Sequence, residues 1–378
     1  MISRPTSEKE CAQIVAAATE PFEIHGTSTK RALGRPQGHH AGLDLSGFSA
    51  LKSYEPEELI LDAGAGAKLS DIEQLLSGHH QYLAFEPPDY STLLGSHHSG
   101  TLGGVLACNL SGPRRIKAGA ARDHVLGLSA VSGRGEVFKA GARVVKNVTG
   151  YDVPKLMAGS YGTLAAFTSV IFKVLPRPEA EETLVVGGLD DEAAVRCMSV
   201  AMQSSADVSG AAHLPGHGTY LRLEGVVPSI LYRREALVKL LGGTIEILNA
   251  ADSQAQWKMI RDVLPFSGTA QRMVWKISVA PAHAPQILAK LKSQFEFRHY
   301  LDWAGGLIWL DCEAENSVAI RQAIGEGHAT LLRGPEVIRT QINVFQPQPP
   351  ALAALSARVK NSFDPKGWFN PGRMYKGV

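Results

Sequence analysis

The sequence has few cysteines and no spacing that would pair them. Its four cysteines, Cys11, Cys108, Cys197 and Cys312, lie far apart, and none forms a C-x-x-C motif. This argues against a disulfide framework, a zinc site or an iron–sulfur cluster within the chain. The sequence also has no run of about 18 apolar residues that would span a bilayer, and its first residues carry no apolar signal-peptide region. We expect a cytoplasmic protein, with any contact with the inner membrane made through a partner.

The chain also has little excess charge of either sign. Lys and Arg number 38 against 36 Asp and Glu, so neither nucleic acid nor an acidic membrane surface is an expected partner. Histidines occur in three adjacent pairs, His39-His40, His79-His80 and His97-His98. Adjacent side chains point to opposite faces of a strand, so we expect no metal site. No G-x-G-x-x-G follows a first strand with an acidic residue about 20 positions on, which argues against an NAD-dependent Rossmann enzyme.

What the sequence does have is a glycine-rich stretch at residues 100–178, around which the rest is organised. Strand-like apolar runs alternate there with glycines and short polar turns, which is typical of a backbone that approaches a large ligand closely. Glycine-rich loops and helix starts can present backbone N–H groups to a pyrophosphate. We therefore interpret the stretch as part of a nucleotide-cofactor domain and expect residues 101–104 to present N–H groups to the cofactor.

The flanking patterns predict helices and strands on both sides of this stretch. Residues 7–19 are predicted to form a helix with Ser7 as N-cap and Glu10 completing a capping box. From residue 182 onward, strands alternate with helices without glycine-rich turns, which predicts an α+β domain. The predicted strands are 183–187, 219–224, 273–279 and 307–312, and the predicted helices are 191–203, 230–241, 256–264, 284–295 and 317–324, with a last helix at 351–361.

Three segments together resemble the PCMH-type (vanillyl-alcohol-oxidase) flavoprotein superfamily, and within it the FAD-binding E subunits of bacterial glycolate oxidases. They are the glycine-rich stretch, the segment D-W-A-G-G-L-I-W-L at 302–310 and the tail F-D-P-K-G-W-F-N-P-G-R-M at 363–374. The resemblance implies an α+β fold with a PCMH-type FAD-binding domain of two α/β subdomains at 1–178. It further implies an α+β cap domain with a mostly antiparallel sheet at 179–346, and a C-terminal helix and tail at 347–378 that return to the FAD domain.

The resemblance also implies where FAD binds. In the superfamily, the loop matching residues 25–30 wraps the flavin pyrophosphate. Thr29 stands where some relatives carry a histidine bonded covalently to the flavin, which implies non-covalent FAD here. An ordinary strand-to-helix turn is the alternative for this loop, and a structural ion pair is the alternative for Arg122 and Asp123. The implied cofactor-binding residues are His25, Gly26, Thr27, Ser28, Thr29, Lys30, Pro87, Thr101, Leu102, Gly103, Gly104, Ser111, Gly112, Arg115, Gly119, Arg122, Asp123, Asn147, Gly150, Tyr151, Asn370 and Arg373.

The function implied by the resemblance is that of a non-covalent FAD-binding subunit of a glycolate oxidase-like complex. Such a subunit contributes to oxidation of glycolate or a related 2-hydroxyacid and to electron transfer to an iron–sulfur subunit. The implied partners are that iron–sulfur subunit and a homologous catalytic flavoprotein subunit. The cap-domain H-x-G-D-G-N-like segment of the superfamily's α-hydroxyacid dehydrogenases is absent from this sequence, so we assign no catalytic residue.

Two other interpretations stay open. The chain is alternatively a stand-alone FAD-dependent 2-hydroxyacid oxidoreductase, with a base such as His97, His98 or Tyr300. It is alternatively a flavin-free scaffold subunit that retains the fold. Trp303 and Trp309 belong either to an exposed apolar docking patch on the cap or to its core.

Overall fold

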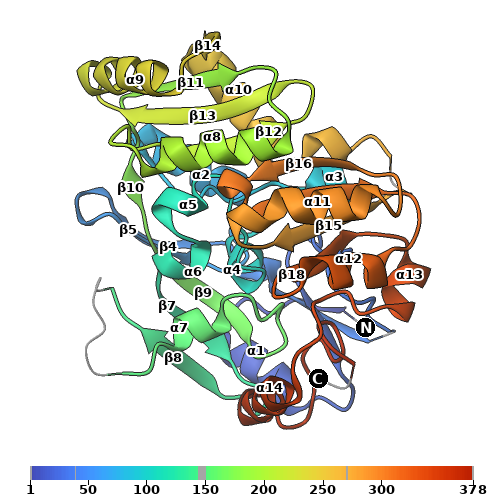
Figure 1. Cartoon of the computed structure of the whole chain (residues 1–378). Helices are drawn as coiled ribbons and strands as arrows, with labels where there is room; N and C mark the ends of the chain where they lie inside the picture. Colours follow the sequence, from blue (N-terminus) through green and yellow to red (C-terminus); the bar gives the residue numbers. More distant parts are fainter. Residues whose placement is uncertain (1, 39, 144–149, 270, 377–378) are drawn as a thin grey trace. The chain divides into compact units, whose positions relative to one another are not determined.

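The computed structural model describes residues 2–38, 40–143, 150–269 and 271–376 (Figure 1). The chain divides into two compact units. The first unit contains Met1–Leu110, Ala120–Pro176 and Pro347–Val378, and the second contains Ser111–Gly119 and Arg177–Gln346. The sequence did not predict that Ser111–Gly119, which lies inside the glycine-rich stretch, packs with the second unit.

The first unit contains a parallel three-stranded sheet, a five-stranded antiparallel sheet and a two-stranded ribbon. The strand orders are β1-β3-β2, β4-β5-β9-β7-β8 and β10-β6. The central strand β9 is buried along most of its length, as expected for a strand with a neighbour on each side. The strand bounds are β1 Ile2–Ser3, β2 Phe22–His25, β3 Ala41–Asp44, β4 Leu51–Glu55, β5 Ile60–Gly64, β6 Gln81–Tyr82, β7 Val125–Val131, β8 Val137–Gly141, β9 Ala166–Lys173 and β10 Leu175–Pro176.

Helix α1 joins the two larger sheets of the first unit. Cys11 and Val15 on its apolar face belong to one buried cluster with Leu43 of β3, Val131 of β7 and Phe369 of the C-terminal tail. This cluster therefore connects the start, middle and end of the chain. The helices of the unit are α1 Glu8–Ala16, α2 Leu69–Gly78, α3 Ser91–Leu94, α4 Leu102–Ala107, α6 Ala121–His124, α7 Val153–Met157 and α14 Pro350–Phe363.

The second unit is built on an eight-stranded antiparallel sheet with the order β14-β11-β13-β12-β16-β17-β15-β18. Figure 1 shows α8 and α11 in front of this sheet, and the two helices contact each other. The strands are β11 Ala180–Val186, β12 Gly210–Leu214, β13 Gly218–Gly225, β14 Ile245–Leu248, β15 Met273–Ser278, β16 Arg298–Asp302, β17 Leu307–Cys312 and β18 His328–Arg333. The helices are α5 Arg115–Ala118, α8 Asp191–Gln203, α9 Val227–Leu241, α10 Ala250–Arg261, α11 Ala284–Lys292, α12 Ser317–Ile324 and α13 Glu336–Gln341.

The predicted fold class, an α+β protein with a mostly antiparallel second sheet, is confirmed. The predicted bounds of α10 were wrong at both ends. It begins at Ala250 because the Asn249 side chain accepts hydrogen bonds from the N–H groups of Ala251 and Asp252, at 2.9 and 3.1 Å. It ends at Arg261, before Val263 adopts a left-handed conformation. Strands β12, β14, β16 and β18 were not predicted from the sequence.

The capping box predicted at the first helix forms only in half. The Ser7 hydroxyl accepts a hydrogen bond from the Glu10 N–H at 3.2 Å, as predicted. The Glu10 carboxylate, however, accepts from the N–H of Thr6 at 2.8 Å. The helix ends at Ala16, short of the predicted residue 19, because Ala17 leaves the helical region.

The C-terminal tail adds to the edge of the parallel sheet. Phe369 forms a parallel bridge with Phe22 of β2, and the Asn370 N–H donates to the Phe22 carbonyl at 3.0 Å. Ahead of this bridge, the buried ammonium of Lys360 donates to the Asp364 carboxylate at 2.6 Å and to the Thr163 carbonyl at 2.6 Å. The same carboxylate accepts from the N–H of Phe369 at 2.8 Å. The ion pair thus fixes where the tail meets β2.

None of the helices in the described segments combines the length and apolar character that crossing a bilayer requires.

We expect Asp364→Asn to lower the free energy of unfolding by about 3 kcal/mol, because it leaves the buried Lys360 ammonium without its charged partner. Urea denaturation measures this loss. Glu57→Gln, at an exposed position in the same unit, is the matched control and is expected to stay within about 0.5 kcal/mol of the parent protein. Equal stability of the two variants would contradict this account of the tail.

Candidate functional site

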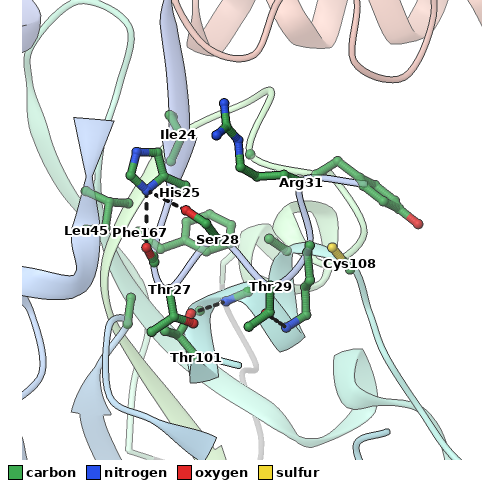
Figure 2. Close-up of a pocket in the computed structure, with 18 of the residues that line it drawn as sticks. Ile24, His25, Thr27, Ser28, Thr29, Arg31, Leu45, Thr101, Cys108 and Phe167 are labelled. Carbon is green, nitrogen blue, oxygen red and sulfur yellow. Dashed lines mark hydrogen bonds between the residues drawn. The ribbon is translucent and has the colours of Figure 1, made fainter. Parts of the chain in front are cut away.

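The first unit contains a cavity at the end of β2, with a volume of about 680 Å³ including the part open to solvent. Figure 2 shows His25, Thr27, Ser28 and Thr29 of one loop along the cavity, facing Thr101. The lining residues are Ile24, His25, Gly26, Thr27, Ser28, Thr29, Lys30, Arg31, Leu45, Ala65, Thr101, Gly103, Gly104, Ala107, Cys108, Tyr161, Gly162, Ala165, Phe167 and Arg373.

The loop that follows β2 is held by short side-chain contacts of its own. The His25 Nδ1 lies 3.1 Å from the Gly26 carbonyl oxygen and 3.3 Å from the Ser28 hydroxyl (Figure 2). Ser28 has a positive φ of 60°, which costs a non-glycine residue of order 1 kcal/mol. The Thr27 hydroxyl donates to the Ser99 carbonyl at 2.7 Å. The loop therefore holds a defined conformation with only one glycine.

Helix α4 forms the opposite wall, and here one expectation was wrong. The N–H groups of Leu102 and Gly103 do not face the cavity as free donors. They donate to the carbonyls of Ala67 and Ala65, at 2.9 and 2.7 Å. The Gly104 N–H lies 3.3 Å from the Thr101 hydroxyl, which caps the helix. The start of α4 is therefore docked on the chain after β5, and the polar groups aimed at a ligand come from elsewhere.

Lys30 brings a cation to the cavity. Its ammonium donates to the Thr29 hydroxyl at 3.3 Å. Burial, followed by weaker opposing effects of Cys108 and Asp89, holds the pKa of Lys30 below its ordinary value. A Cβ added to Gly100 would lie 2.6 Å from the Lys30 ammonium. The glycine thus leaves room for the charged end of the side chain.

Arg373 brings a second cation to the cavity, from the C-terminal tail. It is 6% exposed, and its Nη2 donates to the Lys30 carbonyl at 2.8 Å. Its Nε is buried and has no hydrogen-bond partner among the described residues. Burial lowers the pKa of this guanidinium. Two desolvated cations at one cavity create a strong preference for an anionic ligand.

Cys108 and Tyr161 are among the lining residues that the sequence did not predict. Burial raises the pKa of both, so the thiol and the phenol stay protonated at neutral pH. Tyr161 has a positive φ of 54°, and its carbonyl accepts from the Asn370 amide at 2.8 Å. An isolated cysteine and a tyrosine between a serine and a glycine carry no sequence signal for a ligand site.

Four predicted cofactor residues lie in the second unit and not in the cavity: Ser111, Gly112, Arg115 and Gly119. The Gly112 carbonyl accepts from the Trp303 indole N–H at 3.1 Å. The Arg115 guanidinium lies 4.5 Å from the centre of the Trp303 ring. Residues 111–119 therefore pack against Trp303 within the second unit.

Other predicted residues also lie away from the lining. Arg122 and Asp123 form an ion pair at 3.6 Å, the structural alternative. Pro87 and Leu102 are buried outside the lining, whereas Gly150 and Tyr151 are exposed and Asn147 lies outside the described residues. Asn370 does not line the cavity, but it accepts from the Ile24 N–H at 2.8 Å and so supports the strand that leads into it.

The structure also tests the residues that the alternative interpretations named as a catalytic base or as a docking patch. The Tyr300 hydroxyl is buried and donates to the Ile260 carbonyl at 2.9 Å, so it is not placed as a base. His97 and His98 are exposed and do not line the cavity. Trp303 and Trp309 are 7% and 2% exposed, so of the two alternatives they belong to the core and not to an exposed docking patch. Among the described residues, no three His, Cys, Asp or Glu side chains converge as a metal site requires.

Comparison with known proteins identifies the class first. Residues 1–141 match the FAD binding domain family. Two solved structures of alkyldihydroxyacetonephosphate synthase match 98% of this chain, with TM-scores of 0.69 and 0.67 and identities of 14% and 16%. They are covered over 75% and 76% of their own lengths and show the fold alone. The expectations of an FAD-binding flavoprotein and of the PCMH-type fold are thereby confirmed.

Full-length similarity then narrows the class. The chain is 35% identical to the glycolate oxidase subunit GlcE of Escherichia coli (strain K12) over 357 residues, which cover 94% of this chain and 93% of that relative. The chain therefore belongs to the family of FAD-binding oxidoreductase proteins that includes glycolate oxidase subunit GlcE. Matches to a glycolate oxidase subunit GlcD of Bacillus subtilis (strain 168), 38% identical, and a D-lactate dehydrogenase of Anaerostipes hadrus, 31% identical, cover 30% and 48% of this chain and 24% and 37% of those relatives.

The residues of the cavity fit the cofactor of this family. FAD carries an anionic pyrophosphate, and the unpartnered Nε of Arg373 and the desolvated Lys30 are suited to bind one. A Cβ at Gly26 would lie 2.9 Å from the Thr101 side chain, so glycine is needed where the loop approaches α4. The hydroxyls of the loop add neutral donors.

We expect Gly103→Ala to destabilise the protein by about 1–3 kcal/mol, because the added Cβ would lie 2.7 Å from the Ala65 Cβ and 2.8 Å from its carbonyl oxygen. Thermal and urea denaturation test this. Gly78→Ala, whose Cβ would meet nothing within 4 Å at the end of α2, is the control and is expected to be neutral or slightly stabilising. A neutral Gly103→Ala variant would overturn the assigned packing of α4.

Proposed function

We propose that this chain is the non-covalent FAD-binding subunit of a glycolate oxidase-like complex that oxidises glycolate or a related 2-hydroxyacid. The observation that carries the proposal is the cavity of the first unit, where Lys30 and Arg373 supply two desolvated cations. The nearly full-length similarity to a glycolate oxidase subunit supports the substrate class. We further propose that residues 1–178 with the tail at 347–378 form the FAD domain and that residues 179–346 form the cap.

In this proposal, the Lys30 and Arg373 side chains bind the FAD pyrophosphate, and the hydroxyls of Thr27, Ser28 and Thr29 complete its hydrogen bonding. When bound, FAD would supply an acceptor for the electrons that the complex takes from the substrate. The residues of the chain hold the cofactor and exclude water from its phosphates. Thr29 offers no ring nitrogen for a covalent flavin bond, which supports non-covalent binding.

We propose two partner subunits, a homologous catalytic flavoprotein and an iron–sulfur protein, because relatives of this chain carry the names of glycolate oxidase subunits. Electrons leaving FAD would then pass to the iron–sulfur subunit. We propose a cytoplasmic location, with any contact with the inner membrane made through these partners.

Lys30→Met is expected to weaken FAD binding roughly 10- to 100-fold, the usual worth of a charge-assisted hydrogen bond. Arg373→Met is expected to act in the same direction. Titration of the flavin-depleted protein with FAD, followed by flavin absorption and fluorescence, measures the affinity. Lys9→Met, at an exposed position of α1, is the control. Equal FAD affinity of Lys30→Met, Arg373→Met and Lys9→Met would contradict the site, and no FAD binding by the parent protein would favour the flavin-free scaffold.

A further inference from the structure

The eight-stranded sheet of the second unit consists of two halves with the same order of elements. The first half is β11-α8-β12-β13-α9-β14, and the second is β15-α11-β16-β17-α12-β18. Strands β12 and β16, which occupy the same place in the two halves, are neighbours in the sheet. Among the described residues, a single pair, His213 with Leu301, joins these two strands, whereas β12 pairs with β13 along all of Gly210–Leu214. The boundary between β12 and β16, here called the seam, is therefore where the two halves can separate most easily.

Backbone strain is concentrated where the chain leaves β16 at the seam. Trp303, Ala304 and Gly305 follow this strand and have positive φ values of 53°, 56° and 96°. The left-handed region disfavours residues with a Cβ, so Trp303 and Ala304 keep this conformation only because their surroundings hold it. The three residues contact β12 and α8 of the first half. Strain of this kind is typical of segments that change conformation.

A cluster of charged side chains ties the two halves together across the seam. Asp191, at the start of α8, accepts hydrogen bonds from the His299 Nε2 of β16 at 2.8 Å and from the Lys292 ammonium of α11 at 2.6 Å. Burial acts to raise the pKa of Asp191, but His299 and Lys292 outweigh it and hold this pKa far below its ordinary value. Both donors belong to the second half, so one carboxylate holds the first half against it.

His213 is the titratable group that lies inside this cluster. It is 1% exposed, and its Nδ1 lies 2.9 Å from the Thr219 hydroxyl of β13. Its Nε2 lies 3.8 Å from the Asp191 carboxylate and has no hydrogen-bond partner within the described ranges. Burial is the largest effect on the ring and lowers the pKa of His213. Asp191 and Asp190 oppose this shift, whereas His299 adds to it.

We propose that the seam is a hinge within the second unit, and that Asp191 is the latch that keeps it closed at neutral pH and releases it in mild acid, when His213 takes up a proton. A protonated imidazole at this position would be a buried charge, and the nearest carboxylate is already shared between His299 and Lys292. Exposing His213 to water removes that cost, so proton uptake favours the conformation in which β12 has moved away from β16. Such a device does not depend on FAD and is independent of the proposed function.

The sign of the pH dependence follows from the lowered pKa of His213. Above the ordinary histidine pKa of about 6.5, the ring is neutral in the closed and the open seam, and the closed seam keeps its full stability. As the pH falls below that value, the open seam binds the proton more tightly, and the stability of the closed seam is lost progressively. Asp191 stays charged over this range, so the histidine sets the response.

Hydrogen–deuterium exchange of the full-length protein, followed by mass spectrometry at about pH 7 and about pH 5.5 and corrected for intrinsic exchange rates, tests the hinge. In mild acid, we expect peptides of β12 and β16 to lose protection at least about tenfold more than peptides of β15 and β17. His213→Gln, which cannot take up a proton, is expected to abolish this difference. His217→Gln, at an exposed position in the turn between β12 and β13, is the matched control and is expected to behave as the parent.

Two further measurements decide the question even if His213→Gln does not fold. Asp191→Asn is expected to lower the protection of β12 and β16 already at neutral pH, whereas Glu235→Gln, at an exposed position of α9, is expected to leave it unchanged. Nuclear magnetic resonance of the histidine-labelled parent is expected to give a pKa of His213 below its ordinary value. The hinge would be overturned by equal loss of protection across the sheet in mild acid, by an undiminished loss in His213→Gln, by unchanged protection in Asp191→Asn, or by a His213 pKa at or above its ordinary value.

Discussion

The parallel pairing of the C-terminal tail with β2 is the constraint on which the cavity depends. The tail is held by the buried Lys360–Asp364 pair, and Asn370 then binds the backbone of Ile24 on one side and of Tyr161 on the other. The next turn carries Arg373 to the loop after β2. The last residues of the chain thereby fix the conformation of one of its first loops. A local sequence pattern would not produce this cavity without that long-range contact.

Much of the fold could be predicted from the sequence, because the main helices and strands of the second unit have a clear periodicity of apolar residues. α8, α12 and β17 begin and end where predicted. Strands such as β12, whose residues are glycine, alanine, histidine and leucine, were missed because they lack the β-branched residues typical of strands. Their conformation depends on neighbouring strands. Helix α10 was misplaced because its N-cap, Asn249, precedes a polar first half with no apolar periodicity.

The sequence located the region of the site but did not predict which groups in it face a ligand. The loop at 25–30 and the start of α4 were located by motif, yet two N–H groups expected to face a ligand are used in packing. Cys108 and Tyr161 reach the cavity through the fold alone. In the first unit, the informative feature is a pair of cations removed from water, Lys30 and Arg373. Because desolvation depends on the surroundings of a side chain, composition cannot reveal it.

The central claim is that this chain binds FAD as one subunit of a hydroxyacid-oxidising complex. Its most direct test is the visible spectrum of the purified chain without oxygen, before and after addition of glycolate, and again with the catalytic flavoprotein subunit present. We expect flavin bands that persist with glycolate alone and bleach once that partner is added. Bleaching by glycolate alone would contradict the dependence on a partner and favour a stand-alone oxidoreductase. Failure of the chain to retain or bind FAD in either setting would contradict the assignment of the cofactor site.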